Sequence, residues 1–282
     1  MAHAVTLARW YRARLTVLHA YHVLPLAPMA PEMSPALALP AEVREQLRGE
    51  LERFAEPAGA DAVPVDFAVV EGSAAREILR RAEDDPTDLI VMGTHGRSGF
   101  ERFMLGSVTE KILHRASCAV LTIPCRTAST PPVPVFERVL CALDFSACSM
   151  HALDHAISLA QEANACLTIA HVFEADVPMS SDWRTTLTPE PVRQALVALE
   201  EEGQAQLARA VPRNLGSSCT VDTVMTSGQP AKELLKLADE RNADLIVLGV
   251  RGRNAADLMF FGSTTNTIIR RAACPVLAVH SR

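Results

Sequence analysis

The feature that most constrains the fold of this chain is an internal repeat. Residues 72–124 align without a gap to residues 228–280. The separation is 156 positions throughout, as Gly93 and Gly249 or Cys118 and Cys274 show. An ungapped match of this length is not a chance event, so the chain contains two copies of one structural unit. We call them the first and the second copy.

A weaker match extends the repeat towards the N-terminus. LTVLH at 15–19 corresponds to LTIAH at 167–171, a separation of 152 positions, so a few residues differ in the loops between the matches. At this separation Met1 corresponds to Leu153, and the equivalent of Asp144 would precede Met1. We therefore expect the first copy to lack its first strand. Either the chain is shortened relative to its natural product, or another segment fills the place by swapping or rearranged pairing. The first explanation is favoured because an unfilled central position leaves two rows of unpaired backbone groups.

The second copy alternates short apolar runs with helical patterns. Strands are expected at 138–143, 166–172, 219–228, 244–249 and 275–280, and helices at 148–164, 190–211 and 231–243, with one more helix before the last strand. Strands that are apolar on both faces and alternate with helices predict a doubly wound α/β domain with a parallel sheet. We predict an N-terminally incomplete domain at 1–125, a Pro-rich linker at 126–136 and a complete domain at 137–282. A further Pro-rich stretch, 24–40, is expected to be a surface excursion or lid.

A glycine pattern follows the strand at 244–249 in the second copy. It reads Gly, two residues, Gly, nine residues, Gly-Ser, and comprises Gly249, Gly252, Gly262 and Ser263. Glycine lets backbone N–H groups approach an anion without an intervening Cβ. The last pair opens a helix, whose free N–H groups and dipole favour a bound phosphate. The pattern therefore predicts a phosphate-binding loop.

Other polar side chains surround this predicted loop. Arg251 and Arg253 would offset phosphate charge, and Thr264 or Thr265 would add a hydroxyl donor. Asp144 follows the first strand, where its carboxylate could accept hydrogen bonds from a ribose hydroxyl or an adenine amino group, or could cap the next helix instead. Ligands of doubly wound sheets bind where the winding reverses, so Asp144 and Gly249 should face one crevice.

These motifs resemble the ATP-binding signature of the universal stress protein family. GTHGRSG in the first copy and the Gly-x2-Gly-x9-Gly-Ser spacing in both copies carry the resemblance, which covers nearly the whole chain as a tandem pair. It implies the strand order 3-2-1-4-5 in each domain. It also implies ATP, with or without magnesium, as the ligand of the second copy. The implied contacts are Asp144 and Val172 with adenosine, and Gly249, Arg251, Gly252, Gly262, Ser263 and Thr264 with ribose and phosphates.

The first copy matches the same signature only in its loop. The matching residues are Gly93, His95, Gly96, Gly106 and Ser107, and His95 stands where the second copy has Arg251. The first copy lacks the Asp and the strand that carries it. The resemblance therefore implies nucleotide binding chiefly by the second copy.

Composition excludes several other classes of partner. The formal charge is −6 and no long Lys or Arg run occurs, which argues against nucleic acid. No uninterrupted apolar stretch is long enough to cross a membrane, and no secretory signal is evident at the N-terminus. Seven cysteines without a Cys-x-x-Cys pair are typical of reduced, buried thiols, so we expect a cytoplasmic protein.

Catalysis is not predicted. There is no Gly-x4-Gly-Lys-Ser/Thr loop and no nucleophile with a partnered base, and His151 and His155 share one helix face without an evident third metal ligand. The sequence favours an ATP-binding stress-response protein that senses nucleotide and acts through a partner. One alternative is a nucleotide-independent scaffold whose two copies pair through their last strands. Such pairing would make an intrachain pseudo-dimer, and further homo-oligomers could form. The other alternative is an enzyme, either a slow ATPase or an adenylyl-transferring protein.

Overall fold

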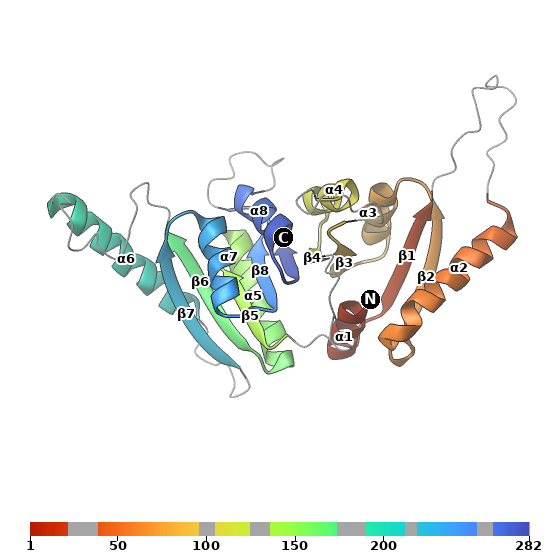
Figure 1. Cartoon of the computed structure of the whole chain (residues 1–282), viewed down its shortest axis with the longest axis horizontal. Helices are drawn as coiled ribbons and strands as arrows, with labels where there is room; N and C mark the ends of the chain where they lie inside the picture. Colours follow the sequence, from red (N-terminus) through yellow and green to blue (C-terminus); the bar gives the residue numbers. More distant parts are fainter. Residues whose placement is uncertain are drawn as a thin grey trace, which may run out of the picture. The chain divides into compact units, whose positions relative to one another are not determined.

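The structure is a computed structural model that describes residues 1–21, 39–95, 105–124, 136–173, 190–211, 219–252 and 262–281. Several predicted features lie outside these ranges: Gly96, Arg253, nearly all of the linker at 126–136 and most of the Pro-rich stretch at 24–40. The described residues form two compact units, one from Met1 to Thr87 and the other from Asp88 onward. Figure 1 labels their elements along the chain.

The second unit is built on a seven-stranded sheet with the order β3-β4-β9-β8-β5-β6-β7. Its strands are β3 (Leu89–Gly93), β4 (Ala119–Ile123), β5 (Arg138–Ala142), β6 (Cys166–Phe173), β7 (Thr220–Ser227), β8 (Leu245–Gly249) and β9 (Val276–Val279). Its helices are α4 (Ser107–Arg115), α5 (Ala147–Ala163), α6 (Glu190–Ala210), α7 (Pro230–Glu240) and α8 (Ser263–Arg271).

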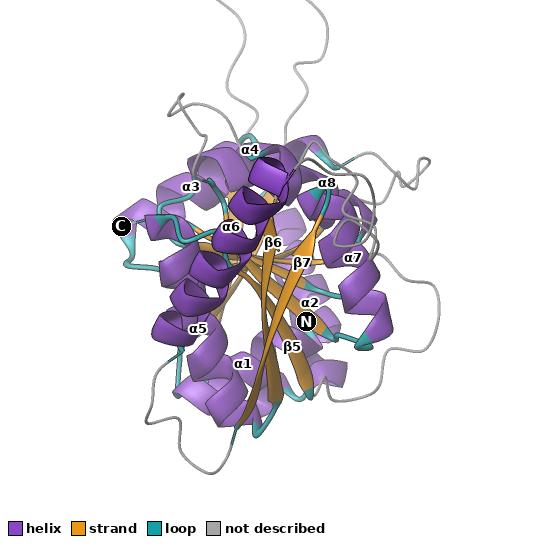
Figure 2. Cartoon of the chain, turned by 90° about the vertical axis from the view of Figure 1, so that its left-hand side faces the viewer, coloured by secondary structure: helices purple, strands orange, loops and turns teal. Residues whose placement is uncertain are grey.

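The second copy supplies five of these strands in the predicted arrangement. Numbered within the copy, β7-β6-β5-β8-β9 is the order 3-2-1-4-5, and all its neighbouring strands are parallel. Figure 2 shows α5 and α6 against one face of β5–β7 and α7 on the other side. The apolar sequence of β5 is explained by its central position, where Val139, Leu140 and Cys141 are at most 1% exposed. The doubly wound α/β fold is thus confirmed.

The last strands of the two copies pair with each other. β4 and β9 are antiparallel, with Leu121 opposite Leu277 and with Val120 and Thr122 opposite Ala278 and Val276. Leu121 and Leu277 are also equivalent in the repeat, so the pairing is symmetric about this one residue pair. Residues that correspond in sequence therefore meet as they would in a two-fold symmetric dimer. The expected intrachain pairing is present.

The first copy is divided between the two units. Its β1 (Leu15–Tyr21) and β2 (Val65–Glu71) form a separate parallel pair, whereas β3 and β4 belong to the seven-stranded sheet. The remaining elements of the first unit are α1 (Ala2–Tyr11), α2 (Ala41–Ala55), α3 (Ala74–Asp84) and two short 3-10 turns at Glu56–Ala58 and Ala60–Ala62. The break falls where the second copy has β5, so the predicted lack of a first strand is confirmed for the described residues.

The offset of 152 positions is visible in the backbone itself. α1 ends at Arg12 and α5 at Asn164, and both residues adopt a left-handed conformation with φ of 51°. Each is followed by the same hydrogen bond, from Ala13 N to Ala8 O and from Ala165 N to Ala160 O. α1 is therefore the counterpart of the last part of α5, and the first turns of that helix have no counterpart.

The described cysteines are free thiols. Cys141 and Cys148 are buried, and burial raises the pKa of the Cys141 thiol to about 12. The expectation of buried thiols is wrong for Cys166, which is exposed at the start of β6, and only half met by Cys118, Cys219 and Cys274, which are half-buried. In the described part of the chain, no helix has the length and apolarity needed to span a membrane.

The symmetric contact between β4 and β9 leads to a prediction about stability. Leu121 and Leu277 are 1% and 4% exposed, and directly opposed side chains in an antiparallel pair touch. Replacing either with Ala should lower the free energy of unfolding by about 2–4 kcal/mol. The double variant should lose less than the sum, by about 0.5 kcal/mol or more, because both changes remove one shared contact.

Urea unfolding of the four proteins measures this coupling. Met150→Ala is the control, since Met150 is 38% exposed and its truncation should cost less than about 0.5 kcal/mol. Strict additivity of the two Leu changes would show that the side chains do not contact each other.

Candidate functional site

The carboxyl ends of β5, β6 and β8 meet at one edge of the sheet. The pairing of β5 with β6 ends at Ala142 and Ala170, and Asp144 and Val172 each lie two residues beyond this pair. Leu143 N donates to Ala170 O at 2.8 Å, which holds β5 against β6 up to this point. Because β6 and β8 flank β5 on opposite sides, the winding of the sheet reverses here, as it does at ligand sites of doubly wound domains.

Asp144 is held by the first turn of α5. Its Oδ1 accepts hydrogen bonds from Ser146 N at 3.0 Å and from Ser146 Oγ at 2.6 Å. Ser146 in turn caps α5, since its Oγ accepts from Ser149 N at 3.2 Å. Asp144 therefore supports the cap residue and is not itself the cap. A role in ligand binding and a role at the start of α5 are thus compatible for this residue.

The other oxygen of Asp144 lies against the glycine loop. A Cβ added to Gly252 would come within 2.7 Å of Asp144 Oδ2. Ser146 Oγ also reaches Arg251 O at 3.4 Å. The start of the loop therefore lies directly beside the carboxylate, and only a residue without a side chain fits at 252 without displacing it.

The turn after Asp144 has a strained backbone and aromatic support. Phe145 has a φ of 61°, a value that residues other than glycine rarely adopt. Its ring lies 4.7 Å from that of His171, centroid to centroid, and His171 Nδ1 lies 2.7 Å from Leu143 O. Phe145 and His171 were not predicted from the sequence as parts of the site. The spacing Asp-x-Ser-x2-Ser from Asp144 to Ser149 is the signal that could have revealed the turn.

Gly249 has a packing role that the sequence did not reveal. A Cβ at this position would lie 2.9 Å from Cys148 C, Cys148 Cβ and Ser149 N. The missing side chain thus allows the first turn of α5 to pack directly on the end of β8. Gly249 brings Asp144 and the glycine loop together whether or not it also contacts a ligand.

The N-terminus of α8 is fixed to the end of β8 by two hydrogen bonds. Gly262 N donates to Val250 O at 3.1 Å, and Thr265 Oγ1 donates to Gly249 O at 2.9 Å. Thr265 is only 4% exposed, so of the two threonines considered as hydroxyl donors it is the structural one. Ser263 is exposed and Thr264 half-buried in the first turn.

The first copy repeats this arrangement at α4. Gly106 N donates to Thr94 O at 2.9 Å, and Thr109 Oγ1 donates to Gly93 O at 2.9 Å. Ser107 is exposed in the first turn of α4, as Ser263 is in α8. The two helix N-termini are therefore equivalent, and the copies do not differ here.

The helices that follow β5 and β8 at this edge, α5 and α8, differ in their caps. α5 is capped by Ser146, whereas no side chain among the described residues caps α8. The first N–H groups of a helix have no partner within it and need one from outside. Of these two helices, α8 is therefore the one with N–H groups available to an anion.

The remaining predicted side chains lie near the ends of β8 and β3. Arg251 is half-buried, and its charge adds to burial in lowering the pKa of His280, which follows β9. His95 Nδ1 lies 2.9 Å from Thr94 Oγ1, and its buried Nε2 has no partner among the described residues. Each copy thus has a nitrogen-containing side chain two residues after the equivalent strands β3 and β8.

The histidine pair on α5 is not part of a metal site in the described ranges. The rings of His151 and His155 stack edge to face at 4.9 Å, and His151 Nδ1 lies 2.9 Å from His280 O. No group of three or more His, Cys, Asp or Glu residues gathers in the described part of the chain. These histidines therefore act as packing residues between α5 and the end of β9.

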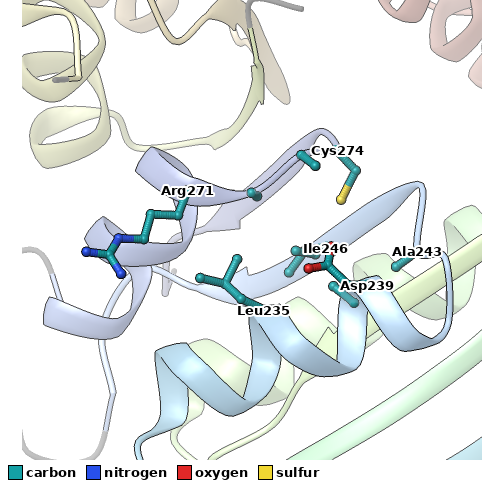
Figure 3. Close-up of a pocket in the computed structure, with 9 residues that line it drawn as sticks. Leu235, Asp239, Ala243, Ile246, Arg271 and Cys274 are labelled. Atoms are coloured by element: carbon teal, nitrogen blue, oxygen red, sulfur yellow. The ribbon is translucent and has the colours of Figure 1, made fainter. Parts of the chain in front are cut away.

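A small cavity lies elsewhere, between α7 and α8 at the amino ends of β8 and β9 (Figure 3). Its volume is about 180 Å³, below the usual range for ligand pockets, and its polar groups are Asp239, Arg271 and Cys274. None of the predicted binding residues lines it. The cavity is therefore separate from the edge of the sheet at Asp144.

Comparison with known proteins identifies relatives of both copies. The profile of the universal stress protein family matches residues 1–124 and 136–280. Universal stress protein YxiE of Bacillus subtilis is 35% identical over 147 residues, which are 51% of this chain and 99% of that protein. A universal stress protein of Mycolicibacterium smegmatis is 27% identical over 224 residues, 77% of this chain and 69% of its own length.

A solved structure shares the fold over the full length. The crystal structure of a universal stress protein from Archaeoglobus fulgidus superposes with a TM-score of 0.65 at 24% sequence identity. The match covers 100% of this chain and 92% of that one.

The different surroundings of Gly249 and Gly93 predict different tolerance to a side chain. A Cβ at Gly249 would clash with the backbone of α5, whereas the nearest atom to a Cβ at Gly93 is His95 O at 3.4 Å. Gly249→Ala should therefore lower the free energy of unfolding by about 1–3 kcal/mol. The matched Gly93→Ala should change it by less than about 0.5 kcal/mol. Equal losses in denaturant unfolding would refute the packing role of Gly249.

Proposed function

Because the chain belongs to the universal stress protein family, we propose that its second copy binds ATP in the crevice between Asp144 and the N-terminus of α8. The observation that carries the proposal is the contact of Gly252 with Asp144, which joins a carboxylate and a glycine loop in one site. The nucleotide would regulate how the protein acts on a partner in the stress response, in the cytoplasm.

The adenosine end of the proposed site is formed by β5 and β6. Asp144 Oδ1 is occupied by the turn of Ser146, and Oδ2 is directed towards the loop. A carboxylate oxygen in that position can accept hydrogen bonds from a ribose hydroxyl or an adenine amino group. Half-buried Val172, like Asp144, lies two residues beyond the last pair of β5 with β6, and it offers an apolar contact for the base.

The phosphate end is formed by the start of α8 and the loop before it. The first turn, which no side chain of the described residues caps, supplies N–H donors, and the positive end of the helix dipole favours an anion. Ser263 and Thr264 add hydroxyl donors, and Arg251 adds positive charge. A magnesium ion that accompanies ATP would reduce the phosphate charge that these groups have to balance.

The proposed activity is binding and not catalysis. Donors and one acceptor are arranged around the crevice, and no side chain in the described part of the site pairs a nucleophile with a base. A slow ATPase would need a group that positions water, and Asp144 is committed to its turn and to the loop.

A second function is favoured by a different observation. The symmetric pairing of β4 with β9 joins the copies without a ligand, so the chain can serve as a dimeric scaffold for a partner. The two functions are compatible, because β4 lies beyond β9 and does not line the crevice.

The adenosine end can be tested with Asp144→Asn. Asparagine keeps an acceptor for Ser146 but replaces the oxygen beside Gly252 with a donor. We expect the affinity for ATP, measured by calorimetry, to fall about tenfold, which corresponds to the loss of one good hydrogen bond. The affinity for inorganic tripolyphosphate should not change. An unchanged affinity for ATP would remove Asp144 from the site.

The phosphate end can be tested with a matched pair, Gly262→Asp and Gly106→Asp. The residues occupy equivalent positions, and a Cβ at either meets a carbonyl oxygen at 3.2 Å or 3.1 Å. Similar structural costs are therefore expected, and thermal unfolding checks this. Only Gly262→Asp should abolish ATP binding in equilibrium dialysis, because it places a negative charge at the proposed phosphate position. If the parent protein binds neither ATP nor ADP, the proposal fails.

A further inference from the structure

One edge of the seven-stranded sheet differs from its counterpart in the second copy. β3 is the terminal strand and, among the described residues, pairs only with β4. Its equivalent β8 has a strand on each side, β9 and β5. β3 thus occupies a terminal position with a sequence that is suited to the interior of a sheet.

The burial of the two strands shows the difference. β3 reads LIVMG and β8 reads LIVLG, so their side chains are nearly identical. The first four residues of β8 are buried, whereas those of β3 are all half-buried. Edge strands in natural proteins are usually protected by charges, prolines or bulges, and β3 has none of these. A strand of this composition is a site for β-strand addition.

The backbone groups on this edge can be assigned from one hydrogen bond. Thr94 N donates to Ile123 O of β4. Along an extended strand, successive N–H groups point to opposite edges. Ile90 and Met92 therefore donate towards β4, and Leu89 and Val91 present their N–H groups to the outer edge.

The repeat identifies the kind of strand that fits this edge. In the second copy, Val139, Leu140 and Cys141 of β5 pair with Leu245, Ile246 and Val247 of β8, in parallel. The equivalents of the β8 residues are Leu89, Ile90 and Val91. Gly93 agrees with this assignment: a Cβ there would meet His95 O at 3.4 Å, whereas a Cβ at Gly249 would meet atoms of α5 at 2.9 Å.

We propose that the outer edge of β3 binds a parallel apolar strand with the sequence pattern of Arg138–Asp144, in the register that β5 adopts on β8. The partner is an extended segment of a polypeptide with four or five consecutive apolar residues and an acidic residue after them. The side chains that β3 presents to such a strand are those that β8 presents to β5. This binding is independent of the nucleotide, since it uses only backbone groups and apolar side chains of β3.

The test uses the full chain and a synthetic peptide of residues 136–146 with a fluorescein label. Fluorescence anisotropy measures binding, and hydrogen exchange followed by NMR locates it. We expect saturable binding and at least about tenfold slower exchange of the Leu89 and Val91 amides. The amides of β7, the other terminal strand of the sheet, serve as the internal control and should not change. A peptide with Pro at 140 and 141 should not bind, because one of the two replaced N–H groups faces β3 in either orientation.

A fusion protein repeats the test without a separate peptide, in case the peptide is poorly soluble. A copy of residues 136–152, the stretch by which the second copy exceeds the first, is fused before Met1. The Leu89 and Val91 amides should then be protected without added peptide. Protection in either experiment supports the proposal. The proposal is overturned if both leave these amides unchanged, if the Pro peptide protects equally, or if protection rises with protein concentration alone, which would identify a second copy of the chain as the occupant.

Discussion

The central strand of the second copy, β5, is the constraint on which the rest of that copy depends. It is hydrogen-bonded on both edges, to β6 and to β8, and its residues Val139 to Cys141 are inaccessible to solvent. A buried strand must satisfy its backbone groups on both sides, so β5 fixes the register of both neighbours. Asp144 lies two residues after the last residue of β5, Ala142, and α5 begins at Ala147. The reversal of winding, the position of the carboxylate and the packing on Gly249 thus follow from one strand.

The first copy shows what the same sequence does without that strand. Its equivalents of β6 and β7 form a two-stranded sheet, and its equivalents of β8 and β9 join the sheet of the second copy. The boundary between the compact units falls at the same point, after Thr87. The symmetric pairing of Leu121 with Leu277 joins β4, and with it β3, to the larger sheet.

Much of this fold could be predicted from the sequence because the repeat is an internal comparison. The apolar runs predict the strands of the second copy, and the family resemblance predicts their order. The offset between the copies predicts that the first copy lacks its first strand. The local geometry of the site was less accessible. Sequence spacing does not distinguish Thr264 from Thr265, since only the direction of the first helical turn decides which hydroxyl reaches Gly249 O. Nor does it reveal that Gly249 faces α5, because a glycine near a predicted loop is equally consistent with ligand contact or with close packing.

The comparison between Gly249 and Gly93 shows that the same glycine motif has different packing in the two copies. Both glycines end a strand, and both accept a threonine hydrogen bond from the helix that follows. Of the two, Gly249 is covered by the first turn of α5, and the N-cap residue of that helix, Ser146, holds the Asp144 carboxylate beside the loop. A glycine loop by itself provides N–H donors, which any anion can use. Selectivity for a nucleoside requires an acceptor at a fixed distance from those donors. In the site proposed above, the packing of α5 on Gly249 would set the distance between the Asp144 carboxylate and the start of the loop.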